Sequence, residues 1–250
     1  MRGKVVIITG AGSGMGEAAA GLFAERGAHV VAADRDSEAA QRVADGINGR
    51  GGSAIAVRCD VTREEEVEAM VARAVEVFGR LDAAYNNAGI QVPARKTADV
   101  PTEEFDRIIS VNLRGVFLCL KHELRQMAGQ GGGAIVNNSS IAGVAGAPTR
   151  SAYAAAKHGI LGLTRTVAGE YADRGIRVNA VCPGTIKTPM VARMLRDGDL
   201  DEQAALEATP MHRFADAAEV AETVYWLCSD ASSYVNGHHI TIDGGQTAIH

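Results

Sequence analysis

The sequence has few of the residues that mark unusual protein classes. Only 4% of its 250 residues are aromatic, six are proline and four are cysteine. The cysteines lie far apart in apolar segments, which excludes a disulfide scaffold or a paired-cysteine zinc site and indicates buried thiols. No apolar run approaches the ~18 residues that a membrane-spanning helix needs. With 46% hydrophobic and 22% charged residues, the composition is that of an ordinary folded protein.

The chain also lacks an excess of positive charge. Its formal net charge of -5 provides no general attraction for nucleic acid or for an anionic membrane. The segment Met1–Ile8 reaches glycine too soon to form the apolar region of a secretory signal. We therefore expect a cytoplasmic protein that binds neither nucleic acid nor membranes.

Short β-branched segments alternate with longer helical patterns along the whole chain. Strict alternation without a linker predicts one α/β domain, residues 1–250, with a parallel sheet covered by helices on both faces. Thr62 and Thr102 are expected to cap the helices that follow them. The break in the pattern at residues 183–209 predicts an irregular segment, and we expect a substrate flap at about residues 185–212. The predicted strands are 5–9, 28–33, 53–58, 81–86, 134–138, 177–181 and 239–242, and the predicted helices 14–26, 37–48, 63–78, 101–128, 149–173 and 216–229.

A glycine-rich turn follows the first predicted strand. The segment Thr9-Gly10-Ala11-Gly12-Ser13-Gly14-Met15-Gly16 has the pattern T-G-x-x-x-G-x-G and not G-x-G-x-x-G. Glycines allow a tight turn and let the backbone approach a pyrophosphate at the start of a helix. Such a turn can be purely structural, but its position between a strand and a helix favours dinucleotide binding.

Asp34 ends the second predicted strand, close to the ~20-residue spacing expected of a carboxylate that binds the adenosine ribose. At ~4 Å its charge would repel a 2′-phosphate by ~4 kcal/mol in a surface-like dielectric, which predicts NAD as the cofactor. Arg35 leaves an alternative open, because its guanidinium could pair with a 2′-phosphate if Asp34 turned away. A simple turn-forming role for Asp34 is the other interpretation.

Tyr153 and Lys157 lie four residues apart in a predicted helix, so both side chains project from one face. A phenol with a pKa of ~10 needs a nearby cation to act as a base. Lowering this pKa by about three units takes ~4 kcal/mol, more than the ~0–1 of an exposed ion pair, so the site must be partly dry. Ser139 and Ser140 end the preceding strand, at the sheet edge where ligands bind, which favours catalysis over a packing role. No nucleophile-elbow pattern surrounds the serines, so acyl transfer is not supported.

The order of these motifs resembles the short-chain dehydrogenase/reductase family across essentially the whole chain. The resemblance implies a single-domain Rossmann fold with a seven-stranded parallel sheet flanked by helices, commonly as a homotetramer. It also implies hydride transfer between a nicotinamide cofactor and an alcohol or carbonyl carbon. The matching positions are Thr9-Gly10-x-x-x-Gly14-x-Gly16, Asp60, Asn86-Asn87-Ala88-Gly89, Asn112, Ser140, Tyr153-x-x-x-Lys157 and Pro183-Gly184.

The resemblance also implies a role for each matching residue. Tyr153 would be the general acid/base, and Lys157 would lower its pKa and hold the nicotinamide ribose. Ser140 would bind the substrate oxygen, and Asn112 would kink its helix and position a proton-relay water. The implied cofactor-binding residues are Gly10, Ser13, Gly14, Met15, Gly16, Asp34, Arg35, Asp60, Val61, Asn87, Ala88, Gly89, Tyr153, Lys157, Pro183, Gly184, Ile186 and Thr188.

Three features depart from the family or stand outside its motifs. Asn138 is polar where the family usually has an apolar residue before its serine pair, and Asn236-Gly237 replaces a frequent Thr-Gly. His238 and His239 are adjacent on a predicted strand and should point to opposite faces, so no metal site is expected.

The sequence therefore predicts a metal-free, NAD-dependent oxidoreductase that acts on a secondary alcohol or ketone. Arg95 and Arg150 could pair with an acidic substrate, although a surface position is the commoner role of arginine. Two alternatives stay open: an NADP-dependent biosynthetic ketoreductase that uses Arg35, and a cofactor-sensing homologue without catalysis. The expected pocket is small and apolar, which favours a cyclic or medium-sized hydrophobic substrate, and is lined by Ile90–Pro93, Ala142–Ala147, Met190, Val191 and Met194.

Overall fold

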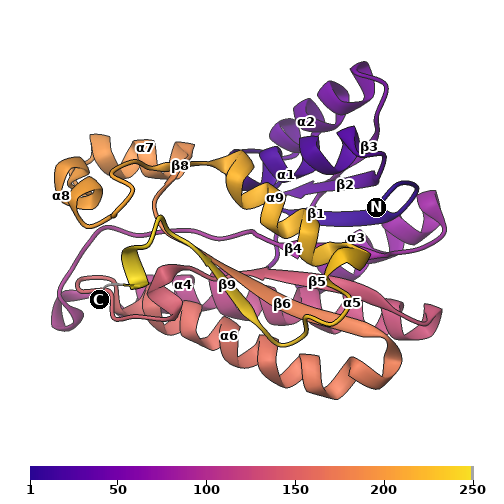
Figure 1. Cartoon of the computed structure of the whole chain (residues 1–250). Coiled ribbons are helices and arrows are strands. Elements are labelled where there is room, and N and C mark those ends of the chain that lie inside the picture. The colour runs from indigo at the N-terminus through magenta and orange to yellow at the C-terminus, as the bar shows by residue number, and fades with distance from the viewer. Residues whose placement is uncertain (249–250) are drawn as a thin grey trace.

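Seven parallel strands form the central sheet of the structure, a computed structural model that describes residues 1–248 (Figure 1). The strand order is β3-β2-β1-β4-β5-β6-β9, so the order reverses direction between β1 and β4. The predicted seven-stranded parallel sheet is confirmed. The strands are β1 Val5–Thr9, β2 His29–Asp34, β3 Ser53–Arg58, β4 Ala83–Asn86, β5 Gly133–Asn138, β6 Ile176–Pro183 and β9 His239–Ile242.

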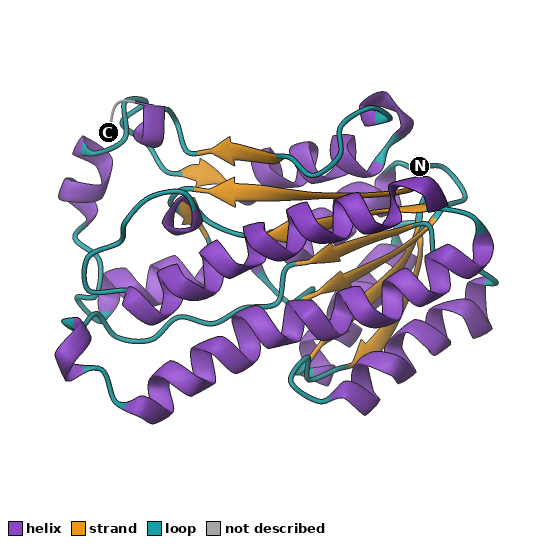
Figure 2. Ribbon diagram, turned by 90° about the horizontal axis from the view of Figure 1, so that it is seen from below, coloured by secondary structure: helices purple, strands orange, loops and turns teal. Residues whose placement is uncertain are grey.

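Helices cover both faces of the sheet because its inner strands are apolar on both sides. Val5 and Ile7 of β1 pack with α3, α5 and α6, whereas Val6 and Ile8 pack with α1, α2 and α9. Figure 2 shows long helices lying across the strands on the α6 side. All four cysteines are buried and unpaired, as predicted. The helices are α1 Gly14–Glu25, α2 Ser37–Gly49, α3 Glu64–Phe78, α5 Gly115–Gln130, α6 Ser151–Tyr171 and α9 Ala217–Cys228.

The predicted helix 101–128 contains a change of helical type. Helix α4, Thr102–Ile109, continues through a π-helical turn at Ser110–Arg114 into α5. Such turns are rare and often occur at functional sites, because they redirect the side chains that follow. None of the helices within residues 1–248 is long and apolar enough to cross a membrane.

The two predicted threonine caps are wrong. Helix α3 follows Arg63 and helix α4 follows Pro101, and neither start has a side-chain cap. The Thr62 hydroxyl donates instead to Asp60 Oδ1 at 2.8 Å. Thr62 lies one residue before the N-cap position of α3, and Thr102 lies one residue after that of α4, so neither hydroxyl caps its helix.

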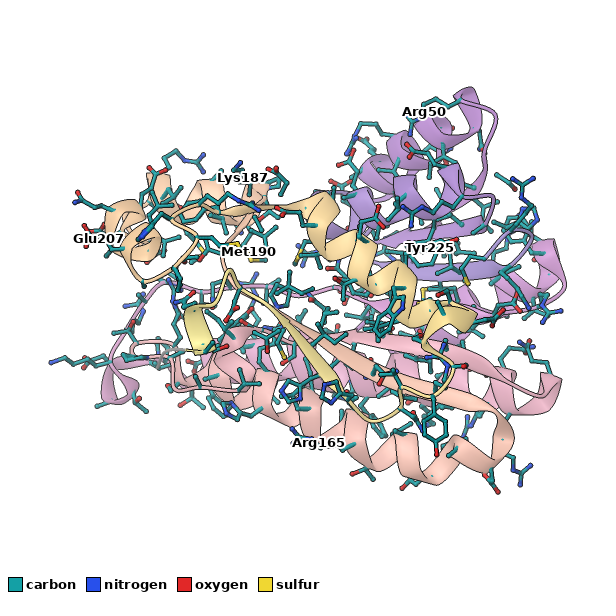
Figure 3. All side chains as sticks on the ribbon, viewed as in Figure 1. Arg50, Arg165, Lys187, Met190, Glu207 and Tyr225 are labelled. Carbon is teal, nitrogen blue, oxygen red and sulfur yellow. The ribbon has the colours of Figure 1, made fainter. Side chains whose placement is uncertain are left out.

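The segment predicted to be irregular contains regular structure. Strand β7, Ile186–Lys187, pairs with β8, Ala215–Asp216, and between them lie α7, Pro189–Arg196, and α8, Glu202–Glu207. Thr188 starts α7 by accepting a hydrogen bond from the main-chain nitrogen of Val191 at 3.3 Å. The two helices lie together beside the main sheet in Figure 1, and Met190 extends from α7 toward the body of the protein in Figure 3.

Candidate active site

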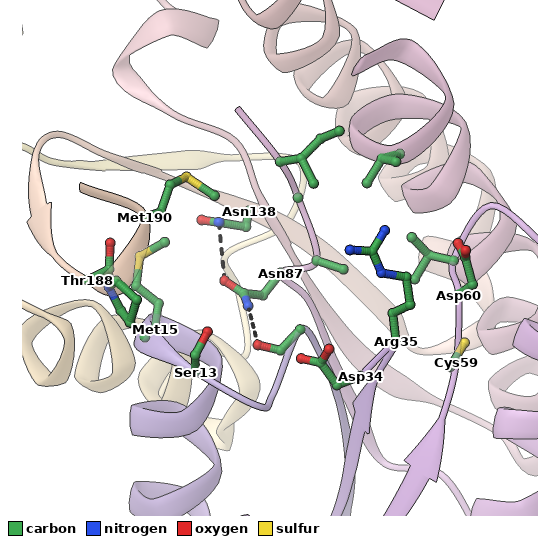
Figure 4. A pocket seen from close by; sticks show the side chains of 18 of the residues that line it. Ser13, Met15, Asp34, Arg35, Cys59, Asp60, Asn87, Asn138, Thr188 and Met190 are labelled. Carbon is green, nitrogen blue, oxygen red and sulfur yellow. Dashed lines mark hydrogen bonds between the residues drawn. The ribbon is translucent and has the colours of Figure 1, made fainter. Parts of the chain in front are cut away.

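A cleft opens at the carboxyl ends of the strands, beside the reversal of strand order between β1 and β4 (Figure 4). This is where open α/β sheets bind ligands. Most of the predicted site residues line it: Gly10, Ser13, Gly14, Met15, Asp34, Arg35, Asp60, Val61, Asn87, Ala88, Gly89, Tyr153, Lys157 and Thr188. The sequence analysis missed Cys59, Val111 and Pro189, each of which also lines the cleft next to a predicted residue.

Six predicted catalytic or cofactor-binding residues do not line the cleft directly: Gly16, Asn112, Ser140, Pro183, Gly184 and Ile186. Of the expected apolar lining, only Ile90 and Met190 line this cleft. Gly16 has a packing role, because a Cβ there would clash with the main-chain oxygen of Gly10. A Cβ on Gly184 would lie 3.0 Å from the Cα of Asp243, so the strand end also needs a glycine. Ile186 is buried in β7, two residues before Thr188, which caps α7.

The glycine-rich turn is fixed by contacts with the residues after β4. The Asn87 amide donates to the main-chain oxygens of Thr9 at 3.0 Å and Gly10 at 3.2 Å. Gly10 and Gly14 have positive φ of 66° and 58°, which glycine adopts without strain. The Ser13 side chain makes no cap bond with α1. The turn thus presents the start of a helix, with its main-chain N–H groups, to the cleft.

Asp34 is held by the main chain on both of its carboxylate oxygens. Oδ2 accepts a hydrogen bond from the nitrogen of Gly12, and Oδ1 accepts one from the nitrogen of Asp36, at 2.9 and 3.0 Å. A rotation of Asp34 away from the cleft would break both bonds. The carboxylate therefore stays beside the glycine-rich turn.

Asp60 follows β3, the strand next to that of Asp34, and is oriented by Thr62. Burial alone would raise its pKa, but the Thr62 hydrogen bonds and the charges of Arg35 and Arg58 lower the pKa below its ordinary value. The Asp60 carboxyl is therefore ionised at neutral pH. Arg35 faces this negative charge as well as the cleft.

Lys157 is buried, and its ammonium is held by the end of β5. Nζ donates to the main-chain oxygen of Asn138 at 2.6 Å and lies 5.4 Å from the centre of the Tyr153 ring. Burial lowers the pKa of Lys157 to about 8, because the charged form loses its hydration. Tyr153 and Lys157 thus meet in the cleft, as their spacing predicts.

The pKa of Tyr153 differs from the sequence-based expectation. Burial raises this pKa above its ordinary value, and a hydrogen bond with Ser140 and the charge of Arg150 offset the rise only in part. The ammonium of Lys157 donates to the main-chain oxygen of Asn138. The expectation that Lys157 lowers the pKa of Tyr153 during catalysis stays a prediction.

The two serines after β5 have different partners. Ser139 donates its hydroxyl to the main-chain oxygen of Lys157 at 2.9 Å, which joins the strand to α6. Ser140 accepts from the nitrogen of Ala142 at 3.2 Å and also bonds with Tyr153. Only Ser140 is placed to share a ligand oxygen with Tyr153.

Asn112 lies in the π-helical turn and is fully buried. Its Oδ1 accepts from the main-chain nitrogen of Ile90 at 2.8 Å, and its Nδ2 donates to the oxygen of Ile90 at 2.9 Å. A π-helical turn thus lies where the resemblance implies a kink. Asn112 ties this turn to the segment that follows β4.

Arg150 does not lie freely on the surface but is half-buried. Its guanidinium donates to the main-chain oxygens of Val92 at 2.6 Å and Asp199 at 2.7 Å. The nitrogen of Ala94 donates to Asp199 Oδ1 at 3.0 Å. These bonds join the start of α6, the segment after β4 and the end of α7. Arg95 contacts Glu104 at 3.6 Å instead.

The expectation that His238 and His239 point to opposite faces is wrong. Their rings are stacked, with centroids 5.4 Å apart, because only His239 belongs to β9. Within the described residues, no group of three histidine, cysteine or acidic side chains could hold a metal ion.

Known proteins share this architecture. A family model described as enoyl-(acyl carrier protein) reductase matches residues 10–247. Cis-4-hydroxycyclohexanecarboxylate dehydrogenase from Sinomonas cyclohexanicum is 46% identical over 247 residues, which cover 98% of this chain and 97% of that protein. Cyclohexanol dehydrogenase from an Acinetobacter species is 44% identical over 245 residues, or 98% and 95% of the two chains. The crystal structure of levodione reductase matches with a TM-score of 0.96 and 40% identity over 100% of both chains.

The fold and these likenesses define the class of protein as an oxidoreductase that acts on CH–OH groups. The chain belongs to the short-chain dehydrogenase/reductase family, whose members use nicotinamide cofactors.

Proposed function

We propose that the protein is an NAD-dependent dehydrogenase or reductase for a secondary alcohol or ketone on a cyclic or medium-sized hydrophobic compound. The observation that carries the proposal is the meeting of Tyr153 and Lys157 in one cleft with the glycine-rich turn and Asp34. The names of relatives support the substrate class. Two of them are named for a cyclohexane ring that carries a hydroxyl group, and a third is named as the reductase of a diketone, levodione.

The residues of the cleft fit a dinucleotide. The turn at Gly10–Gly14 offers main-chain N–H groups at the start of α1, which suits a pyrophosphate. Asp34 would offer a fixed carboxylate to the adenosine ribose, and Asp60 and Val61, which also line the cleft, would contact the adenine. Thr188 would contact the carboxamide. When bound, the nicotinamide ring supplies the hydride donor or acceptor.

Asp34 favours NAD over NADP. The NADP-dependent alternative needs Asp34 to turn away so that Arg35 can pair with a 2′-phosphate. That movement would break the hydrogen bonds with Gly12 and Asp36. Arg35 also faces the ionised Asp60, which competes for its charge.

Tyr153 would move the substrate proton. In the oxidising direction Ser140 and Tyr153 would bind the alcohol oxygen, and the carbinol carbon would give its hydride to the oxidised nicotinamide ring. The positive charge of that ring would favour the Tyr153 phenolate, which would take the proton of the alcohol. Lys157, with a pKa of about 8, can exchange a proton near neutral pH. Asn112 holds Ile90 and would position the water that carries this proton to solvent.

The substrate would lie under the flap at residues 185–212. Met190 lines the cleft from α7, and Ile90 lines it from the segment after β4. The apolar character of these side chains suits a ring of carbon atoms. The homotetramer and the cytoplasmic location expected from the sequence remain part of this proposal. A cofactor-sensing protein without catalysis would have no need for Ser140, Tyr153 and Lys157 together.

Two measurements on the purified protein test the proposal. Fluorescence titration should show binding of NADH that is at least about tenfold tighter than that of NADPH. A panel of cyclic and linear alcohols and ketones, followed by nicotinamide absorbance, should show turnover with cyclic compounds foremost. Binding of neither cofactor, or no turnover of any alcohol or ketone, would contradict it.

A further inference from the structure

Asn138, the polar residue at a position that is usually apolar in the family, ends β5 and lines the cleft. Its side chain is buried, with the residue 6% exposed. The Oδ1 atom receives no hydrogen bond from any residue in the described part of the chain. Buried polar atoms are almost always paired, so an unpaired acceptor in a binding cleft needs an explanation.

The orientation of the Asn138 amide is fixed by its neighbours. Asn87 donates its Nδ2 to the main-chain oxygens of Thr9 and Gly10, which can only accept. Asn87 must therefore present its oxygen to Asn138, whose Nδ2 donates to it at 3.3 Å. Exchanging the nitrogen and oxygen of Asn138 would bring two oxygens together, so Oδ1 remains the free acceptor. Figure 4 shows this chain of hydrogen bonds.

The free oxygen faces a part of the cleft that has few donors. In Figure 4 it points toward the side lined by Met15, Thr188 and Met190. Methionine has no hydrogen-bond donor, so packing of Met15 or Met190 over Asn138 cannot pair the oxygen. Lys157 has three N–H donors, but in the described structure its ammonium bonds with the main-chain oxygen of Asn138 and not with Oδ1. A ligand in the cleft can supply the missing donor.

We propose that Asn138 Oδ1 accepts a hydrogen bond from the nicotinamide half of the cofactor, from either the carboxamide N–H or a ribose O–H. The inference rests on the proposed function, because it requires a nicotinamide dinucleotide in this cleft. Asn138 is then a cofactor-binding residue, and its side chain links the cofactor through Asn87 to the glycine-rich turn.

The test compares the dissociation constants of wild type and Asn138→Leu by fluorescence titration, without substrate. Leucine has the same branching but no polar atom, so NADH should bind about 3- to 10-fold more weakly. The gain in melting temperature on adding NADH should also shrink. If Asn138→Leu does not fold, Asn138→Ala takes its place. The matched control is Asn137→Leu on the opposite face of β5, which should melt at a lower temperature but keep its NADH affinity within about twofold.

Cofactor analogues identify the donor and separate a direct bond from an effect through Asn87. The ratio of variant to wild-type dissociation constants should fall to about one with the 3-acetylpyridine analogue if the carboxamide N–H donates. It should fall to about one with an analogue that lacks a nicotinamide-ribose hydroxyl if that hydroxyl donates. A ratio near one for NADH itself, an equal ratio for every analogue, or an equal loss in Asn137→Leu would overturn the inference. If wild type binds neither NADH nor NADPH, the proposed function fails instead.

Discussion

The two sides of the cleft are held in place by different kinds of contact. On the adenosine side, Asp34 and Gly12 are joined by a hydrogen bond between adjoining elements of the first βαβ unit. On the flap side, one guanidinium, that of Arg150, joins the main chain at Val92 and Asp199, which are far apart in the sequence. The cofactor side therefore depends on local structure, and the flap side depends on contacts between distant segments, such as those of Arg150 and the bond from Ala94 to Asp199.

The two sides of the cleft also differ in how many of their helical residues are buried. Helix α1 buries five residues, including Phe23, whereas α7 and α8 have no buried residue. Segments with few buried apolar contacts open at the lowest free-energy cost. The adenosine side is thus suited to hold a cofactor in one geometry, and the flap side is suited to admit and release a substrate.

The largest effect should come from Tyr153, which lies between the two sides. Tyr153→Phe should lower turnover by about 10³-fold, because the general acid/base is lost, while NADH affinity stays within about twofold. Initial rates with cyclohexanol and an NADH titration measure both quantities. The matched control is Tyr171→Phe at the far end of α6, which should keep its activity. Appreciable turnover by Tyr153→Phe would show that another group moves the proton.

A change at Asp34 tests the adenosine side. Asp34→Asn keeps an acceptor for the Gly12 nitrogen but removes the charge that repels a 2′-phosphate. The preference for NADH over NADPH should fall by about 10²-fold, which is less than the full Coulomb energy because solvent screens this site. Titration of wild type and variant with both cofactors measures the change. An unaltered preference would mean that Asp34 does not select the cofactor.

A change at Glu123 tests the stability of the packing between α5 and the central sheet, beneath both sides of the cleft. It is fully buried on α5, its Oε2 accepts from Asn86 Nδ2 at 2.9 Å, and burial raises its pKa to about 7. Between its ordinary pKa of about 4.3 and 7, the folded state holds a proton that the unfolded state has lost, so stability should fall as pH rises through this window.

Glu123→Gln should remove this dependence and raise the free energy of unfolding at pH ~8 by about 3 kcal/mol relative to wild type. Urea denaturation at pH ~5 and ~8 gives both values. The exposed Glu170→Gln on α6 is the control, with no expected change. A wild-type stability that rises between these pH values, with no gain in Glu123→Gln, would show that Glu123 is ionised when buried.

Arg150 tests the flap side, and its effect should be the smallest on activity. Arg150→Met keeps an unbranched apolar stem but removes the guanidinium and its bonds with Val92 and Asp199, so the KM for a cyclic alcohol should rise about tenfold while NADH affinity is kept. The pH profile of alcohol oxidation should also move to higher pH, because Arg150 lowers the pKa of Tyr153. Arg165→Met in α6 is the control. An unchanged KM and pH profile in Arg150→Met would show that the bonds of Arg150 do not hold the flap side.

The difference between the two sides also explains what could be predicted from the sequence. The strands, the glycine-rich turn and the Tyr153–Lys157 pair follow from local patterns: apolar runs, glycine spacing and the helical period. Arg150 gave no such signal, because its partners are main-chain oxygens in distant segments. The threonine caps failed because each helix starts one residue away from the position that the spacing assigned to its N-cap.

Asn138 shows what a sequence signal can and cannot give. Its polarity marked it as a departure from the family, but the sequence did not indicate a role. The role depends on the direction of the Asn87 amide, which is set by main-chain oxygens on the turn after β1. Only the three-dimensional arrangement brings these groups together.

Isotope transfer tests the central claim most directly. The protein would be incubated with NAD and cyclohexanol deuterated at its carbinol carbon, and the reduced cofactor would be analysed by mass spectrometry. Direct hydride transfer predicts one deuterium per molecule of reduced cofactor in wild type, and no reduced cofactor in Tyr153→Phe within the same time. Reduced cofactor that carries no deuterium would contradict it.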